Sequence, residues 1–425
     1  MKAIKNVNIY DFDRYIENGY IIYKENIIEV GKMEHFKFEG QTIDGKGKLI
    51  IPGLVNGHTH IYSTLFRGLS LEFHPKNFQD ILTQLWWKFD SELKEDEIYY
   101  SGLVYGVESL KNGVTTLVDH HASGEIENSL KTIKKAIVDK LNMRIILAFE
   151  TSDRFNVLKC IKENLTFLNY KNEFFTGIFG MHASMSLSDE TLLEIKKNIV
   201  DLPIHVHIAE SAEDETDSYN KYSKSIIERF DDVGLINDNS IMAHCVHIEE
   251  EEANILKEKD IFIALNPSSN FNNNVGIFNY NLLKELKILV GTDGLGSNVA
   301  KEIYNLNLII KKSMDSPVGV SNEKIIGFIN NSYELVNRLL NIKIGKIRQS
   351  YKSDFLLIDY NNPTPMDKSN IFSHILFGVF DNLRPEKVFI EGKEVLSNYK
   401  VHNQEEIYEE ALKVSTKLFE KFGDD

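Results

Sequence analysis

The sequence predicts an α/β fold, a (β/α)8 TIM-like barrel with a small discontinuous β-sandwich domain built from both termini. Two observations predict it. Between residues 49 and 292, eight short apolar segments alternate with amphipathic segments, and this alternation is typical of eight strand–helix units. Further strand-like segments precede this region and recur after residue 352, so both ends of the chain supply strands to one small domain.

The predicted barrel strands are short runs rich in Val, Ile, Leu and Phe, as expected for parallel strands buried on both faces. Amphipathic segments at 96–112, 126–140 and 188–199 predict helices between them, and later helices are expected at 322–340 and 404–422. The eight strands are expected at residues 49–57, 114–119, 144–150, 175–182, 203–209, 240–245, 261–266 and 287–292.

The small domain is expected to combine the two ends of the chain. Neither end has enough strands for a stable domain alone, so the two sets of strands should pair. We expect a small β domain of residues 1–52 plus 346–402, a barrel of residues 53–345 and a C-terminal helix within 403–425.

Charge and composition exclude several classes of partner. The 425 residues include 48 basic and 63 acidic side chains, a formal net charge of −15. This field repels phosphates, so we expect no nucleic-acid partner and no membrane partner. The two cysteines provide no disulfide framework, and no segment approaches 18 apolar residues or resembles a signal peptide. We therefore expect a cytoplasmic protein.

The first predicted barrel strand ends on two histidines, in Ile51-Pro-Gly-Leu-Val-Asn-Gly-His-Thr-His60. Side chains at i and i+2 of a strand project from one face, so His58 and His60 can grip one divalent cation. Alone, such a pair is more often a surface or hydrogen-bonded core feature than a metal site.

Three further strand ends carry residues that bind metals or transfer protons. In a barrel, functional groups come from the C-terminal ends of the strands. Strand five contains His205 and His207 and is followed by Glu210, strand six ends at His244, and strand eight leads into Asp293. We expect His207, nearer the strand end, to face the metal and His205 to lie behind it or in the core.

The chain resembles the amidohydrolase superfamily in its branch of mononuclear aminohydrolases and chlorohydrolases, which includes adenosine-derivative and guanine deaminases. More narrowly it resembles SsnA-type aminohydrolases, through Trp86-Trp87 and Asp119-His-His-Ala-Ser123 among other segments. The superfamily motifs are Pro52-Gly-Leu-Val-Asn-Gly-His-Thr-His60, Arg67-Gly68, His207-Ile-Ala-Glu210, Ala243-His-Cys-Val-His247, Asn266-Pro-Ser-Ser-Asn270, Gly291-Thr-Asp-Gly294 and Ser353-Asp-Phe-Leu-Leu-Ile-Asp359.

This resemblance implies one divalent metal ion held by His58, His60, His207 and Asp293. It also implies a catalytic set of Glu210, His244 and Asp293. Zinc is the favoured ion and iron the alternative, because the same nitrogen and oxygen ligands accept both. Binuclear relatives use a carboxylated lysine on strand four, and residues 175–182 contain no lysine, so we expect a single metal ion.

Substrate contacts are expected from His182, Arg67, Trp87 and Asn270. The resemblance places a substrate-contacting histidine at His182, although its surroundings, Gly180-Met-His-Ala-Ser184, depart from the Pro-His-Ala-Pro-Tyr pattern usual in relatives. Trp87 could stack on a flat ring or pack in the core. Asn270 could contact a polar ring or cap a helix.

Two further histidines, His120 and His121, follow strand two. They face opposite ways if the chain is extended, so at most one lines the pocket.

The resemblance implies hydrolytic deamination of a nitrogen heterocycle of the purine, pterin, pyrimidine or triazine class, with release of ammonia. A bound ion lowers the pKa of water from about 16 to near 7, and Glu210 would protonate a ring nitrogen as hydroxide attacks. The alternatives are hydrolytic dechlorination or cyclic-amide hydrolysis by the same centre, and an inactive ligand-binding relative. We expect a small-molecule heterocyclic substrate and a homodimer or higher homo-oligomer.

Overall fold

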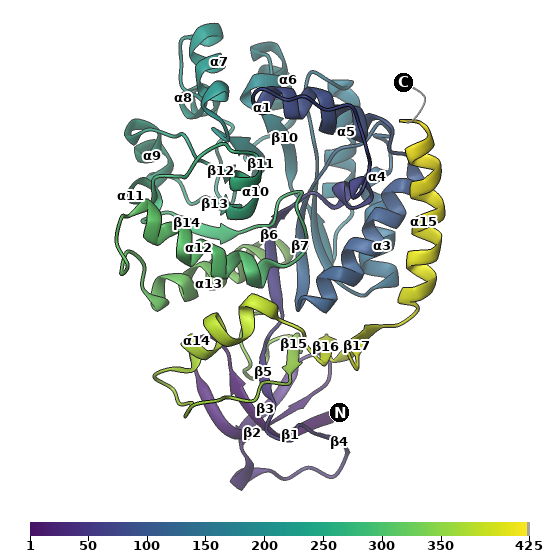
Figure 1. Cartoon of the computed structure of the whole chain (residues 1–425), viewed down its shortest axis with the longest axis vertical. Coiled ribbons are helices and arrows are strands. Elements are labelled where there is room, and N and C mark those ends of the chain that lie inside the picture. The colour runs from purple at the N-terminus through teal and green to yellow at the C-terminus, as the bar shows by residue number, and fades with distance from the viewer. Residues whose placement is uncertain (423–425) are drawn as a thin grey trace.

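A computed structural model describes residues 1–422 and shows a barrel standing on a small β domain (Figure 1). The barrel strands are almost completely buried, which explains why their sequences are continuous apolar runs. The barrel strands are β6 (Leu54–Thr59), β7 (Val114–His121), β8 (Arg144–Phe149), β9 (Phe175–Gly177), β10 (Phe179–Ala183), β11 (Ile204–Ile208), β12 (Ile241–His244), β13 (Phe262–Leu265) and β14 (Lys287–Val290).

Hydrogen bonds across two seams close the barrel. Strands β6 to β9 form one parallel sheet and β10 to β14 another, and β9 and β10 are one strand interrupted at Ile178. At one seam, Thr151 N–H donates to the Gly180 carbonyl oxygen at 3.1 Å. At the other, Thr292 N–H donates to the His58 carbonyl oxygen at 3.0 Å. These contacts join the edges of the two parallel sheets, as the predicted TIM-like barrel requires.

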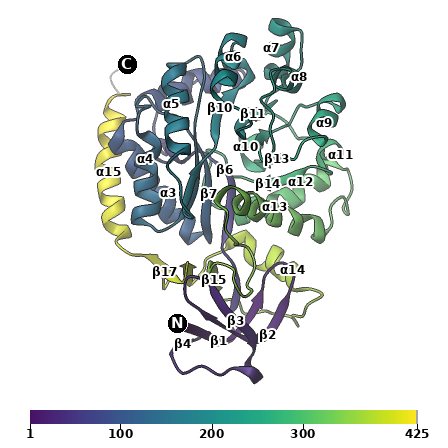
Figure 2. The same cartoon turned by 180° about the vertical axis from the view of Figure 1, so that it is seen from behind.

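Helices follow the strands around the outside of the barrel (Figures 1 and 2). The loop and helices after β6 are the longest such insertion and contain the aromatic residues that reach the top of the barrel. The main helices are α2 (Trp87–Ser91), α3 (Glu95–Lys111), α4 (Ser129–Lys134), α5 (Val157–Leu168), α6 (Asp189–Asn198), α7 (Ala212–Tyr222), α8 (Ile226–Asp232), α9 (Glu250–Lys257), α10 (Pro267–Asn272), α11 (Tyr280–Leu283), α12 (Val299–Ser313) and α13 (Asn322–Leu340).

The small domain is one sheet with strands from both ends of the chain. Tyr23 of β2 packs edge-on against Phe355 and Phe389, although two strands separate β2 from β15, so the sheet folds over a shared core. Its strands are β1 (Lys2–Tyr10), β2 (Tyr15–Tyr23), β3 (Ile27–Lys32), β4 (Gln41–Asp44), β5 (Leu49–Pro52), β15 (Phe355–Ile358), β16 (Lys387–Ile390), β17 (Lys393–Ser397) and β18 (Lys400–Val401).

The segment expected as a single strand at 49–57 is two strands in two sheets, so that expectation is wrong. Strand β5 pairs with β1 and β15 in the small domain, and β6 enters the barrel after Gly53. A Cβ atom at Gly53 would lie 2.3 Å from the Thr115 side chain, so only glycine permits this close passage.

The small domain attaches to the barrel at the N-terminal ends of the strands. Arg144 begins β8, is completely buried, and forms ion pairs with Asp354 and with Glu391, the latter at 2.9 Å. The C-terminal helix α15 (Gln404–Glu420) lies beside α3 in both views (Figures 1 and 2). Both attachments leave the C-terminal ends of the strands free for a site. Within residues 1–422, no helix is long and apolar enough to cross a membrane.

Candidate active site

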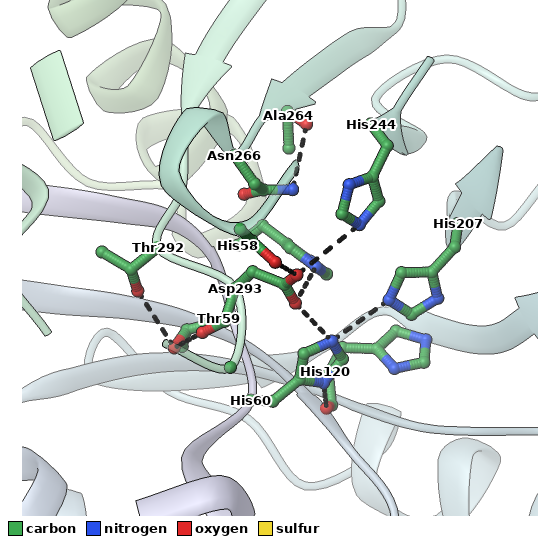
Figure 3. A network of polar contacts seen from close by, with 12 residues as sticks. His58, Thr59, His60, His120, His207, His244, Ala264, Asn266, Thr292 and Asp293 are labelled. Atoms are coloured by element: carbon green, nitrogen blue, oxygen red, sulfur yellow. Dashed lines mark hydrogen bonds and ion pairs between the residues drawn. The ribbon is translucent and has the colours of Figure 1, made fainter. Parts of the chain in front are cut away.

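Five polar side chains converge at the C-terminal ends of four barrel strands (Figure 3). His58 lies on β6 and His60 directly after it, His207 comes from β11, His244 from β12, and Asp293 from the turn after β14. His60 Nε2 lies 3.0 Å from Asp293 Oδ1 and 3.2 Å from His207 Nε2. His58 Nε2 lies 3.5 Å from the same carboxylate oxygen. The ligands expected from the sequence therefore share one small volume.

Close backbone packing places Asp293 in this cluster. A Cβ atom at Gly291 would lie 2.2 Å from Asn266 Oδ1 and 2.7 Å from the His58 carbonyl oxygen, so glycine lets β14 approach β6. Asp293 and His244 then adopt left-handed backbone conformations, with φ of 53° and 75°. Such conformations in residues other than glycine cost free energy and cluster at functional sites.

Two histidines are oriented so that their Nε2 atoms can both bind one cation. His60 Nδ1 donates to the His120 carbonyl oxygen at 2.6 Å, and His207 Nδ1 donates to the His182 carbonyl oxygen at 2.9 Å. In neutral rings, both Nε2 atoms then present lone pairs, yet they face each other at 3.2 Å. A shared cation satisfies both nitrogens together with the Asp293 carboxylate, so the donor set fits a divalent metal.

Two more buried nitrogens support the same conclusion. His58 Nε2 and His244 Nε2 are buried without a hydrogen-bond partner in residues 1–422. Behind them, His58 Nδ1 contacts His205 Nε2 at 2.8 Å, and His244 Nδ1 donates to Asn270 Oδ1 at 2.8 Å. Histidine ligands commonly have such a partner on the other ring nitrogen, which fixes the ring and its tautomer.

Glu210 lies beside the cluster rather than in it. Its Oε2 is 3.5 Å from His244 Nε2, and Asn273 donates to its Oε1 at 3.4 Å. Burial raises the pKa of Glu210 to about 7. Burial also disfavours the charge of Asp293, but the neighbouring rings of His58 and His60 hold its pKa well below the usual range. Neighbouring carboxyls therefore have opposite protonation tendencies, as an acid and an anionic ligand require.

These groups open into one cavity of about 810 Å³, including its mouth. His182 and Trp87 line it, along with Tyr62 and Trp86, and their contact with substrate stays a prediction. His182 Nδ1 donates to Ser186 Oγ at 2.7 Å, because that hydroxyl gives its own hydrogen to the Ala183 carbonyl oxygen. His182 Nε2 is therefore an acceptor.

Two residues expected to contact substrate do not line this cavity. Arg67 lies on the surface, where it forms a two-pronged ion pair with Glu108 at 2.8 and 3.0 Å. Asn270 is buried behind His244, and its side-chain oxygen accepts from the His244 ring. Neither side chain faces the cavity, because each is held by another residue, and direct contact of either with substrate stays a prediction.

His120, His121 and His205 are buried around the cluster but do not line the cavity. His120 Nε2 donates to the Met181 carbonyl oxygen at 2.9 Å, and His121 Nε2 contacts Ser123 Oγ at 2.9 Å. His205 supports His58, as expected from its deeper position on β11.

Sequence reasoning missed a second charged group at the cavity. Glu150 follows β8 directly, and Asp90 lies on α2; both line the cavity and are held by Arg154. Glu150 could have been found by the strand-end rule, because it terminates the third predicted strand. No sequence pattern points to Asp90, because its partner Arg154 lies 64 residues away in the chain.

The sequence matches the model of the amidohydrolase family over residues 49–395. The chain belongs to the amidohydrolase family. This membership confirms the predicted resemblance and the predicted class, a hydrolase of carbon–nitrogen bonds other than peptide bonds. Family membership also implies a divalent metal ion, which the donor set above fits. The narrower resemblance to SsnA-type enzymes stays a prediction.

Curated relatives of this amidohydrolase align with nearly the whole chain. A 5'-deoxyadenosine deaminase of Methanococcus maripaludis (strain C6) is 33% identical over 430 residues, covering 95% of this chain and 96% of that protein. The 5'-deoxyadenosine deaminase of Methanocaldococcus jannaschii is 30% identical, with 97% and 98% covered. A 5-methylthioadenosine/S-adenosylhomocysteine deaminase of Carboxydothermus hydrogenoformans is 28% identical, with 98% of each chain covered.

Solved structures share the fold of this amidohydrolase. An adenosine deaminase from Xanthomonas campestris with bound zinc superposes with a TM-score of 0.85 at 17% identity, covering 99% of this chain and 98% of that one. The atrazine chlorohydrolase TrzN from Arthrobacter aurescens TC1, complexed with zinc, gives 0.82 at 19% identity, covering 99% and 100%. These likenesses establish a barrel with a small β domain.

Proposed function

We propose that this amidohydrolase hydrolytically deaminates the adenine ring of a nucleoside, releasing ammonia. One observation carries the proposal. Glu210, a buried carboxyl with a pKa of about 7, lies beside the converging side chains of the proposed ligand set and faces His244 across 3.5 Å. A ligand-binding relative without activity has no chemical need for such an acid at this position.

Separate residues of the chain bind the metal, transfer protons and hold the attacking oxygen. A divalent ion, when bound by His58, His60, His207 and Asp293, supplies a water of lowered pKa. Asp293 would accept a proton from the attacking water, and Glu210 would give a proton to the ring nitrogen next to the attacked carbon. Transfer of the Asp293 proton to the exocyclic amine would then let the carbon–nitrogen bond break and ammonia leave, while the new hydroxyl returns its proton to Glu210. His244, with Nε2 facing both carboxylates, hydrogen-bonds the attacking oxygen.

We propose zinc as the ion, with iron as the alternative. Three imidazole nitrogens and one carboxylate oxygen suit zinc and also accept iron, so the donor set alone favours neither strongly. Two superposable structures contain zinc, which supports the choice.

An adenine nucleoside is the substrate class best supported. The curated relatives are named for substrates that combine adenine with a ribose changed at its 5' position. In this chain, Tyr62, Trp86 and Trp87 line the cavity and offer aromatic faces to a flat base.

An ammonia-release assay tests the proposal. Zinc-loaded protein is offered adenosine, 5'-deoxyadenosine, guanine, a pterin, cytosine and a chlorinated triazine, and metal content is measured on the same sample. Release of ammonia from adenine nucleosides with the highest kcat/KM is the expected result. Release of chloride, or ring opening without ammonia, would favour the alternative hydrolyses by the same centre.

Two controls complete the assay. Chelation should abolish turnover and zinc should restore it. Tight binding of a nucleoside by zinc-loaded protein without turnover would identify an inactive relative. The expected homodimer or higher homo-oligomer stays a prediction, tested by light scattering on the same preparation.

A further inference from the structure

The cavity has a second polar side, formed by Trp87, Asp90, Glu150 and His182, which we call the Glu150 wall. Arg154 lies behind it, 4.9 Å from the Trp87 ring centre. Arg154 is held by Asp90 through Nη1 at 3.2 Å and Nη2 at 2.8 Å, and by Glu150 Oε1 through Nε at 3.2 Å and Nη2 at 2.8 Å. Four of its five N–H groups are therefore engaged.

This clamp leaves one carboxylate oxygen for a ligand. Glu150 Oε1 accepts from Arg154 and from Ser152 Oγ, whereas Oε2 accepts no hydrogen bond within residues 1–422. Glu150 is 3% exposed. Although burial disfavours its charge, Arg154 lowers the pKa of Glu150 to about 2, so the free oxygen belongs to an anion. Nearby, Trp87 Nε1 is a buried donor with no described partner.

Apart from the proposed metal centre, the charged side chains that line the cavity are acidic. No lysine or arginine of the described residues lines it, because the Arg154 guanidinium points to the two carboxylates from behind. The acidic residues that line it are Asp90, Glu150, Glu210, Asp214 and Asp293. An anionic ligand group at the Glu150 wall would face an ionised carboxylate with no free cation beside it, which is strongly unfavourable in a buried site.

We propose that Glu150 is a specificity-determining residue that accepts a hydrogen bond from an uncharged or cationic donor group of the substrate and excludes anionic groups. The inference rests on the proposed deamination of nucleosides and narrows it. A nucleoside with a hydroxyl or amine at this wall is accepted, and a phosphorylated one is rejected.

Kinetics with adenosine and adenosine 5'-monophosphate test this inference. We expect the wild-type kcat/KM for adenosine to exceed that for the monophosphate on the order of 100-fold, because like charges held close together in an interface strongly lower affinity. Glu150→Gln should lower kcat/KM for adenosine about tenfold by weakening a charge-assisted hydrogen bond, and should shrink the preference over the phosphate. Glu150→Asp keeps the charge but shortens the side chain. It should therefore lower kcat/KM for adenosine and keep the preference for adenosine over the monophosphate.

Glu127→Gln is the matched control, because it removes one negative charge from a surface side chain that is 55% exposed. This variant should leave kcat/KM for both substrates unchanged. An unchanged preference in Glu150→Gln, or equal use of both substrates by the wild type, would overturn the inference while leaving deamination intact.

A second measurement separates this inference from the proposed function. Inorganic phosphate should raise the Tm of zinc-loaded Glu150→Gln more than that of the wild type or Glu127→Gln, because removing the carboxylate charge relieves the exclusion of anions. If no nucleoside releases ammonia, the proposed function fails, and this comparison still decides the role of Glu150. Equal shifts in all three proteins would then overturn it.

Discussion

The cavity has two polar sides of different origin. The metal-side wall, formed by His60, His207, Glu210 and Asp293, comes from strand ends and the turns directly after them. The Glu150 wall combines a strand end with helix α2 and with Arg154 from a loop. The first holds groups whose spacing is set by the barrel, and the second holds groups whose positions depend on one ion-pair cluster. The contrast separates the chemistry of the site from its selectivity.

Asp293→Ala should have the largest effect, because it removes the only carboxylate of the proposed ligand set. We expect loss of bound metal and a fall in kcat on the order of 10⁴-fold or more, since water without a bound ion keeps a pKa near 16. Metal analysis and ammonia release on one sample check this. Asp232→Ala, at a surface residue 60% exposed, is the control. Full metal occupancy in Asp293→Ala would remove it from the ligand set.

Glu210→Gln should retain the metal and lower kcat by about 10²–10⁴-fold, the usual contribution of a general acid. Because burial raises the pKa of Glu210 to about 7, its acid form is abundant below that pH and disappears above it. Wild-type kcat should therefore fall as the pH rises beyond about 7. Glu213→Gln, at an exposed position of α7, serves as the control. A near wild-type rate for Glu210→Gln would exclude it as the acid.

Asn270→Ala tests whether His244, which faces Glu210 and Asp293 of the metal-side wall, depends on a residue behind it. Losing the oxygen that accepts from His244 Nδ1 frees the ring to rotate or change tautomer. We expect a 10–100-fold lower kcat, about the effect of losing a partner of a metal-site histidine, with little change in KM. Asn270→Asp keeps the accepting oxygen and should recover most of the loss. A raised KM with unchanged kcat would instead support direct contact with substrate.

The sequence was sufficient to predict the histidine cluster at the strand ends because backbone geometry determines it. Residues at i and i+2 of a strand share a face, and parallel strands end at one rim, so His58, His60, His207 and His244 had to lie close together. The tautomers could not be predicted, because they depend on carbonyl groups of His120 and His182 that only the folded barrel brings into range.

The Glu150 wall was harder to predict for a physical reason. Arg154 joins Asp90 and Glu150 through side-chain hydrogen bonds, and such pairings across 64 residues leave no periodic pattern in the sequence. Arg67 lies outside the cavity for a related reason. The sequence motif identified Arg67 as a candidate, but its ion pair with Glu108 on α3 holds the side chain at the surface. Ion pairing between distant residues therefore limits prediction more than strand geometry does.

Trp87→Phe should have the smallest effect and tests the Glu150 wall without touching charge. The change keeps an aromatic ring against Arg154 and removes the unpaired Nε1–H donor. One neutral hydrogen bond contributes about 0.5–1.5 kcal/mol, so KM for adenosine should rise about two- to tenfold with kcat nearly constant. Trp87→Leu also removes the ring, and should add a loss of Tm. If Trp87→Phe lowers kcat and leaves KM unchanged, the donor acts on the reacting ring, and the division between the two walls fails.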